Sequence, residues 1–227
     1  MINESIIVGR VILEFILIIC AFQLGKSWLY ALLVLNLLLV SLFGAKLIFI
    51  FGFLTNGGNV FYASIFLITH ILIEHYGEKS ALRGVWLGFG ALVMFVIMLQ
   101  SALLVISAPA TVALANAQAI VFQLVPRIMF ASLTAYLLAQ QVQIYIYERL
   151  RIKTKNKVLW LRDTVANIIG QLLDSVVFFG IAFLGVLPAN VLIQTMIVGF
   201  SLKIGIGFLG TPVLYLCGYR KAKSPIE

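Results

Sequence analysis

Long apolar segments separated by short polar gaps form the main pattern of this chain. Most of these segments reach the ~20 residues that an α-helix needs to cross ~30 Å of hydrocarbon. The pattern therefore predicts an all-α fold, a polytopic membrane helical bundle of about seven transmembrane helices. We expect the helices at residues 6–24, 28–52, 59–76, 82–107, 118–147, 164–187 and 190–217.

Positive charge is concentrated in every second gap between these segments. All Lys and Arg residues except Arg10, Lys46, Arg127 and Lys203 lie in gaps that alternate with gaps free of charged residues. Because loops rich in Lys and Arg stay in the cytoplasm, we expect the amino terminus outside and the carboxyl terminus in the cytoplasm. The charged gaps are 25–27, 77–83, 148–163 and the tail after 217, and the uncharged gaps are 53–58, 107–117 and 187–189.

The composition leaves little material for a soluble domain. Hydrophobic residues make up 63% of the chain and charged residues 11%, and the mean hydropathy is +1.12. We therefore interpret residues 1–227 as a single integral membrane domain, with the first apolar segment a retained helix rather than a signal peptide. The net charge of +8 follows from membrane orientation, with contact to the anionic head groups of the lipid bilayer. We expect no nucleic-acid partner.

Several charged side chains lie inside the predicted spans. A charge near the middle of a bilayer costs ~2.5 to 3.5 kcal/mol, so such groups usually face the bundle interior, pair with one another or line a transport path. Counting ~1.5 Å per helical residue places Asp174, Arg127 and Lys203 in the middle third of the membrane. Arg10 and Glu14 are four residues apart, which predicts a local ion pair. The other charges within spans are Lys46 and Glu74.

The sixth predicted span carries a polar stripe. Asn167, Gln171 and Asp174 recur at i, i+4 and i+7, which places two amides and a carboxylate on one helix face. One interpretation is interhelical hydrogen bonding, worth ~0.6 to 2 kcal/mol for each bond in membrane bundles, and it applies to Gln140 as well. The other is a ligand site, because a carboxylate flanked by amides can complement the edge of a purine-like base.

A cluster at the cytoplasmic end of the third span suggests a different class of protein. His70, Glu74 and His75 could serve a membrane-embedded metal enzyme, but His75 is rotated by ~140° from His70 around the helix. The metal enzyme is therefore a minor alternative, and a structural subunit without transport activity is another. We expect no catalytic residue, no metal and no cofactor.

Small residues recur at helical spacing in two places. Ala131, Ala135 and Ala139 are four residues apart on the fifth span, and Gly84 and Gly88 have GxxxG spacing on the fourth. Both patterns are typical of close helix packing. The alanine stripe is also a candidate docking face for a partner protein.

Four stretches of the chain resemble the queuosine precursor transporter family, also described as putative vitamin uptake transporters. The resemblance covers about residues 28–219, so residues 6–24 would be an extra N-terminal helix on a family-like core. This chain resembles a divergent member, because the family usually has Asp at the positions of His70, Gln143 and Gly210. The stretches are GNVFYASIFLITHILIEHYGEKSALRGVWLGF from Gly58, PRIMFASLTAYLLAQQVQIYIYERL from Pro126, LWLRDTVANIIGQLLDSVVFFGIAFLG from Leu159 and GTPVLYL from Gly210.

The resemblance implies a multi-pass transporter of the cell inner (plasma) membrane that takes up a 7-deazaguanine-type base for tRNA modification. Its bundle would resemble the substrate-binding components of energy-coupling-factor vitamin importers. Two alternatives therefore stay open, a substrate-capture subunit that depends on an ATPase module, and a transporter of a different small heterocycle. A homo-oligomer also stays open. The retained family positions are Lys46, Glu74, Tyr76, Gly77, Pro126, Arg127, Gln140, Trp160, Arg162, Gln171, Asp174 and Lys203.

These observations give a set of candidate substrate-binding residues. Asp174 and Gln171 would hydrogen-bond the edge of the base, and Arg127 and Lys203 would balance the carboxylate. Glu74 and His70 would line the cytoplasmic exit. Trp160 and Arg162 fit an anchor at the cytoplasmic interface. The remaining candidates for substrate binding are Asn167, Gln140 and Lys46.

Overall fold

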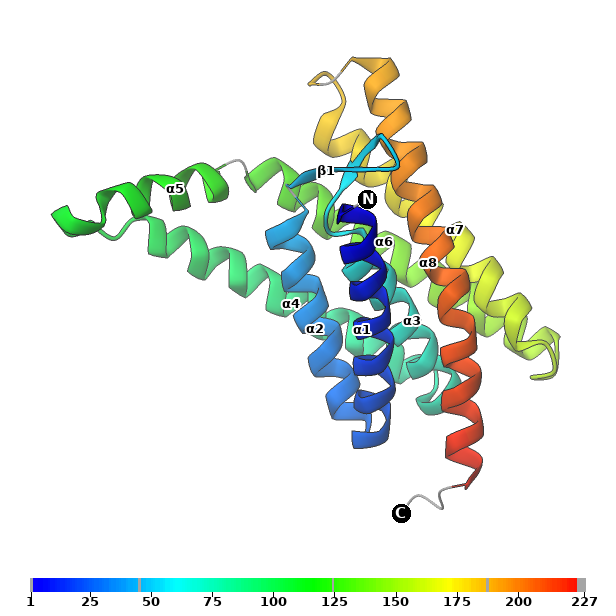
Figure 1. The fold of residues 1–227 in the computed structure, drawn as a ribbon. Coiled ribbons are helices and arrows are strands. Elements are labelled where there is room, and N and C mark those ends of the chain that lie inside the picture. The colour runs from blue at the N-terminus through cyan, green and yellow to red at the C-terminus, as the bar shows by residue number, and fades with distance from the viewer. Residues whose placement is uncertain (1, 45, 124, 187, 224–227) are drawn as a thin grey trace.

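The computed structural model describes residues 2–44, 46–123, 125–186 and 188–223, without the side chains at 47, 54, 120–127, 129 and 219–223. Within these residues the chain is mostly helical, with one β-hairpin (Figure 1). The elements are α1 (Ile2–Leu24), α2 (Lys26–Phe43), β1 (Leu47–Ile50), β2 (Phe53–Asn56), α3 (Asn59–Tyr76), α4 (Glu78–Leu103), the 3-10 helix η1 (Pro109–Thr111), α5 (Val112–Gln123), α6 (Val125–Lys153), α7 (Leu159–Phe183) and α8 (Ala189–Lys223).

The predicted all-α membrane bundle is confirmed. Each predicted span contains a helix, and α3 coincides with the third span at both ends. Within the described part of the chain, five helices (α1, α2, α4, α7 and α8) are long and apolar enough to cross a membrane. The protein is thus a multi-pass membrane protein, while the count of seven spans and the orientation of the termini stay predictions.

Helix α3 forms the centre of the bundle. Every side chain from Asn59 to Ile73 is buried, so the helix has no exposed face over this length. Its neighbours are α1, α2, α4, α6 and α8. A helix that is apolar on all sides is expected to lie in a protein core. This helix therefore holds the side chains that reach into the bundle interior.

A β-hairpin replaces the end of the second predicted span. Helix α2 ends at Phe43, and β1 and β2 pair antiparallel around a turn at Phe51 and Gly52, which both have positive φ. Positive φ at both central residues is the geometry of a type I′ hairpin turn. Apolar length alone predicted a continuous helix to residue 52, and this prediction is wrong because Gly44 follows the last helical turn and Gly52 permits the hairpin.

The fifth predicted span covers parts of two described helices, on either side of residue 124. Helix α5 ends at Gln123 and α6 begins at Val125, with Pro126 in its first turn. Proline has no N–H to donate and its ring clashes with the preceding turn, so the first turn of a helix is a favourable place for it. Figure 1 shows α5 and the distal half of α4 projecting away from the other helices as an arm.

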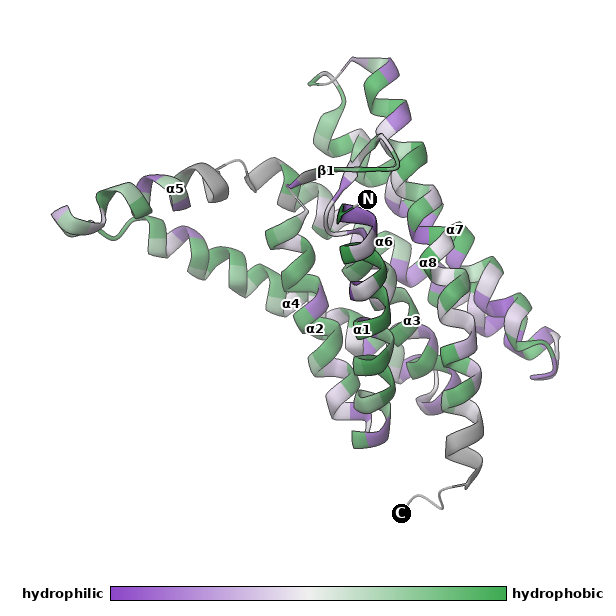
Figure 2. Ribbon diagram, in the orientation of Figure 1, coloured by the Kyte–Doolittle hydropathy of each residue, from purple (hydrophilic) through white to green (hydrophobic). Residues whose placement is uncertain are grey.

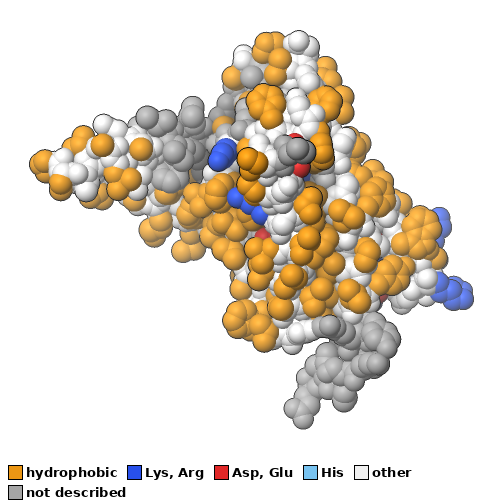
Figure 3. Space-filling model, in the orientation of Figure 1, with side chains coloured by type: hydrophobic (Ala, Val, Ile, Leu, Met, Phe, Trp, Pro, Cys, Tyr) orange, Lys and Arg blue, Asp and Glu red, His pale blue; other side chains and the backbone are white. Residues whose placement is uncertain are grey.

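The outer surface of the molecule is largely apolar. Figure 2 shows hydrophobic residues along the arm and the outer faces of α1 and α2, and Figure 3 shows hydrophobic side chains over much of the same view. Exposed examples include Ile12 and Leu13 of α1 and Met94 and Met98 of α4. Apolar area on this scale is typical of a surface that faces lipid rather than water.

Small residues allow close contact between helices. Ala131, Ala135 and Ala139 are completely buried. A Cβ added at Gly88 would lie 2.7 Å from the hydroxyl oxygen of Tyr136 and 2.9 Å from Cδ2 of Leu33. The packing interpretation of both patterns is therefore confirmed. The alanine stripe is not available as a docking face, because the bundle itself covers it.

Gly88→Ala should lower the thermal unfolding temperature of the purified protein. The added methyl group would press α4 against α2 and α6, and overpacking of this kind costs ~1 to 3 kcal/mol. Gly90→Ala is the matched control, because a Cβ at Gly90 meets nothing within 4 Å and alanine favours a helix by ~1 kcal/mol over glycine. Equal unfolding temperatures for the two variants in detergent would contradict the close packing.

Candidate functional site

An ion pair between α7 and α8 forms the centre of the candidate site. Nζ of Lys203 donates to Oδ2 of Asp174 at 2.7 Å, and the hydroxyl of Tyr62 on α3 donates to Oδ1. The same Nζ lies 4.4 Å from the centroid of the Tyr62 ring, a cation–π contact. Asp174 is 3% exposed and Lys203 is 7% exposed. Both oxygens of the carboxylate are therefore engaged within the bundle.

The polar stripe of α7 lies on a buried face beside this ion pair. Nε2 of Gln171 donates to Oδ1 of Asn167 at 3.5 Å, and both side chains are buried. Asn167 lies directly over Gly207 of α8, where an added Cβ would be 1.9 Å from Nδ2. The structure thus brings Asn167, Gln171, Asp174 and Lys203 together at the contact of α7 with α8.

Two amides of α6 extend the polar region toward α7. Nε2 of Gln143 donates to Oε1 of Gln140 at 2.7 Å, and both residues are buried. A Cβ at Gly170 of α7 would lie 2.9 Å from Cβ of Gln143 and 2.7 Å from Cε1 of Phe66. The absence of a side chain at Gly170 therefore lets α6 and α3 approach α7 beside Gln171.

A second ion pair lies toward the carboxyl end of α3. Nη2 of Arg162 donates to Oε1 of Glu74 at 2.6 Å, and the hydroxyl of Tyr147 donates to Oε2 at 3.0 Å. Arg162 is 1% exposed. We predicted Arg162 as part of an interfacial anchor, and this is wrong, because its side chain crosses from α7 to Glu74 of α3 and Tyr147 of α6.

His70 has its own partner next to this ion pair. Its Nδ1 lies 2.5 Å from Oδ1 of Asp163, whose Oδ2 accepts from the hydroxyl of Thr211 at 2.5 Å. Where the family usually has Asp, this chain thus has a group that can hydrogen-bond the carboxylate of Asp163. The ring of His75 instead packs against Phe22, with centroids 4.8 Å apart. His70, Glu74 and His75, the proposed metal cluster, therefore have different partners.

One predicted site residue, Lys46, does not join these contacts. Lys46 lies between α2 and β1 with an exposed side chain, outside the helical part of the bundle. Its assignment to the interior of a span is wrong, because α2 ends before it. The side chain of Arg127 falls outside the described residues, so its place in the site stays a prediction.

The predicted ion pair of Arg10 with Glu14 is also wrong. Oε2 of Glu14 accepts from Nδ2 of Asn36 at 3.0 Å. The guanidinium of Arg10 lies 5.6 Å from the ring centroids of Phe43 and Phe61. Glu14 thus pairs with Asn36, and Arg10 with the aromatic rings, rather than with each other. A helix in a bundle has neighbours on other helices as well as one turn away along its own length.

Tyr62, Tyr147 and Asp163 were not among the predicted site residues, although each contacts one of them. The hydroxyl of Tyr62 donates to Asp174 and that of Tyr147 donates to Glu74, while the carboxylate of Asp163 lies within hydrogen-bond distance of His70. One signal was present, because Tyr62, Phe66, His70 and Glu74 are each four residues apart. This spacing places them on one face of α3, the face directed at α6 and α7.

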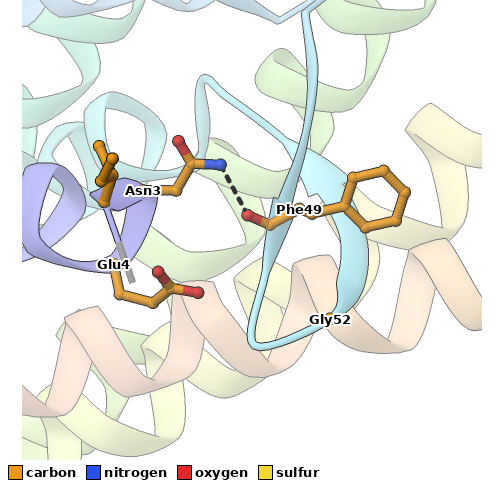
Figure 4. A pocket seen from close by; sticks show the side chains of 5 residues that line it. Asn3, Glu4, Phe49 and Gly52 are labelled. Atoms are coloured by element: carbon orange, nitrogen blue, oxygen red, sulfur yellow. Dashed lines mark hydrogen bonds between the residues drawn. The ribbon is translucent and has the colours of Figure 1, made fainter.

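A hollow of about 620 Å³ lies at the amino-terminal end of α1. Figure 4 shows Asn3 and Glu4 of α1 on one side of it and Phe49 and Gly52 of the hairpin on the other. Nδ2 of Asn3 donates to the carbonyl oxygen of Phe49 at 2.9 Å, and the backbone N–H of Phe51 donates to Oε1 of Glu4 at 2.9 Å. The hairpin is thus bonded to α1, and this hollow is separate from the residues around Asp174.

Residues 56–217 match the model of the family described as "Putative vitamin uptake transporter". This range begins at the end of β2 and extends into α8, so it includes both ion pairs. It does not include α1 and α2.

Curated proteins give a match over nearly the whole chain. The chain is 30% identical over 217 residues to the "Probable queuosine precursor transporter" of Bacillus subtilis (strain 168), covering 95% of this chain and 94% of that protein. It is 29% identical over 156 residues to the "Queuosine precursor transporter" of Escherichia coli (strain K12), covering 59% and 58%. It is 27% identical over 140 residues to the "Probable queuosine precursor transporter" of Haemophilus influenzae, covering 59% of this chain and 54% of that protein. The comparison with solved structures gives no match.

Proposed function

Because this chain belongs to the family described as "Putative vitamin uptake transporter", we propose that it imports a queuosine precursor, a 7-deazaguanine-type base, for tRNA modification. Its relatives from Bacillus subtilis and Escherichia coli are named "Probable queuosine precursor transporter" and "Queuosine precursor transporter", which supports the first part of this proposal. A multi-pass membrane protein that handles a small heterocyclic base would work in the cell inner membrane, without a catalytic step.

The observation that carries this proposal is the buried ion pair of Asp174 with Lys203. Burying an ion pair costs desolvation free energy that the attraction between the two charges often does not recover. An ion pair kept inside an apolar bundle therefore suggests a functional role. Here the pair joins α7 to α8 and, through Tyr62, to α3. A ligand that bonds to Asp174 would compete with Lys203 and Tyr62, and the contacts among these three helices would change with it.

Substrate would meet the two ion pairs in sequence. We assign Asp174, Gln171 and Asn167 to binding of the base edge, with Lys203 as the counter-ion and Gln140 on the facing helix. Glu74 and His70, closed by Arg162 and Asp163, would then be the exit toward the cytoplasm. Opening one ion pair while the other stays closed would keep ions from leaking through the bundle.

The proposal is tested by uptake of radiolabelled precursor into cells that cannot synthesise it. We expect queuosine to appear in their tRNA when this chain is expressed, and not when it is absent. A strain that produces the protein in its membrane but accumulates neither precursor nor modified tRNA would contradict the proposed function. Uptake of other labelled heterocycles in the same cells would decide between this substrate and a different base.

Purified protein in liposomes should accumulate precursor without an added ATPase module. The capture-subunit alternative needs a docking face, and the alanine stripe considered for it is covered by the bundle. Accumulation is measured with labelled base trapped inside the liposomes, and protein-free liposomes are the control. Uptake that appears only when an ATPase module is supplied would favour the capture subunit instead.

A further inference from the structure

Three glutamine side chains of α6 and α7 are completely buried. Gln140, Gln143 and Gln171 are each 0% exposed. A buried amide without its hydrogen bonds costs free energy, so such groups are normally paired. Among the described side chains, however, Nε2 of Gln140, Oε1 of Gln143 and Oε1 of Gln171 have no hydrogen-bond partner. These unpaired atoms are what a polar ligand would satisfy.

Gln140 and Gln143 of α6 lie beside the segment of α7 that carries Gln171. Gln140 and Gln143 are hydrogen-bonded to each other, and Gln143 contacts Gly170, the residue before Gln171. Helices α6 and α7 follow each other in sequence and run antiparallel, so residues equally far from the connecting turn lie at the same level. Asp174 is one turn further along the same face of α7.

Aromatic rings of α3 border this region. The ring of Phe66 lies against Gly170, and its centroid is 5.4 Å from that of Tyr62, which binds Asp174. Amides that read an edge and rings that cover a face are the two contacts by which proteins recognise a planar base.

We propose that Gln140, Gln143 and Gln171 form the subsite that reads the hydrogen-bonding edge of the transported base, and that this subsite selects a neutral base over one that carries a protonated amine. The inference rests on the proposed transport function. The unpaired atoms are two acceptors, on Gln143 and Gln171, and one donor, on Gln140. A guanine-type edge offers the complement, N–H donors beside a carbonyl acceptor.

The selection for a neutral base follows from the charges around the amides. Among the described side chains, the formal charges closest along α7 to Gln171 are those of Asp174 and its partner Lys203, which neutralise each other at 2.7 Å. The buried carboxylate of Asp163, two turns before Gln171, already contacts His70 and Thr211. A protonated amine on the base would add a third charge in a buried site, and it would have to displace Lys203 to find a counter-ion. A neutral substituent, such as a nitrile, adds no charge to bury.

A competition experiment in the uptake cells tests this selection. Labelled 7-deazaguanine with a nitrile substituent is the transported base, and an unlabelled base with a protonated alkylamine is the competitor. We expect the neutral base to be preferred by about tenfold or more, the effect of one unfavourable buried group. Gln143→Glu should reduce or reverse this preference, because the added carboxylate provides a counter-ion for the amine.

The controls separate the subsite from folding and from the transport function. Gln143→Leu and Gln171→Leu should reduce uptake of the neutral base about tenfold for the lost hydrogen bonds, whereas Gln141→Leu, on the exposed side of α6, should not. The rise in unfolding temperature that each base causes in each purified variant, relative to the same variant without a base, repeats the comparison independently of uptake. Equal preference in wild type and Gln143→Glu would overturn the subsite alone, but failure of wild type to take up either base would overturn the transport function with it.

Discussion

Asp174→Ala should reduce precursor uptake by about 100-fold or more. The substitution removes the acceptor proposed for the base and leaves Lys203 buried without its carboxylate partner. Removing one partner of a buried ion pair costs ~3 to 5 kcal/mol, because the remaining charge stays desolvated. Uptake of labelled precursor is measured per amount of protein in the membrane, so that a lower protein level is not mistaken for lower activity.

A double variant separates the two effects of this substitution. Asp174→Ala combined with Lys203→Leu removes both charges, so thermal stability should recover relative to the single variant while uptake stays absent. Glu14→Gln is a second control, because Glu14 is a buried acid bonded to Asn36 away from the ion pair. Unchanged uptake in Asp174→Ala would remove this residue from the binding site.

Arg162→Ala should cause a large loss of stability. The guanidinium lies between Glu74 of α3 and Tyr147 of α6 and is 1% exposed, so its removal leaves a carboxylate without its cation. The expected loss is ~3 to 5 kcal/mol, measured as the unfolding temperature of protein purified in detergent.

Arg149 provides a matched control on α6. Its side chain is exposed and contacts the ring of Tyr145, so Arg149→Ala should change stability by no more than ~0.5 kcal/mol. Replacing Arg162 and Glu74 together with leucine should restore part of the stability lost in Arg162→Ala. Similar losses for Arg162→Ala and Arg149→Ala would show that the second ion pair contributes little to the fold.

The positions of the helices and of the central charges could be predicted from sequence for one physical reason. A membrane imposes an apolar length on each span and a large cost on each charge within it, so exceptions such as Asp174 and Lys203 indicate the interior of the bundle. The i, i+4, i+7 spacing on α7 then gave the shared face of Asn167 and Gln171.

Contacts between helices far apart in the sequence could not be predicted in the same way. Glu14 has Arg10 one turn away, yet it bonds to Asn36, because the fold of α2 against α1 brings a donor closer. Asp163 and Arg162 were counted with the polar loop, but α7 begins before them and carries both into the bundle. Apolar length also did not indicate that residues 47–56 form two short strands rather than a helix. Because α2 ends before these strands, Lys46 lies outside the interior of the bundle.

The central position of α3 has a mechanical consequence. Tyr62 and Glu74 belong to different ion-pair networks, yet both extend from this one helix, ~18 Å apart at 1.5 Å per residue. A helix is stiff along its axis, so a tilt or slide that frees Tyr62 from Asp174 also displaces Glu74 relative to Arg162. Movement of this one helix would thereby couple the two networks, so that binding of substrate beside Tyr62 would also change the contact between Glu74 and Arg162.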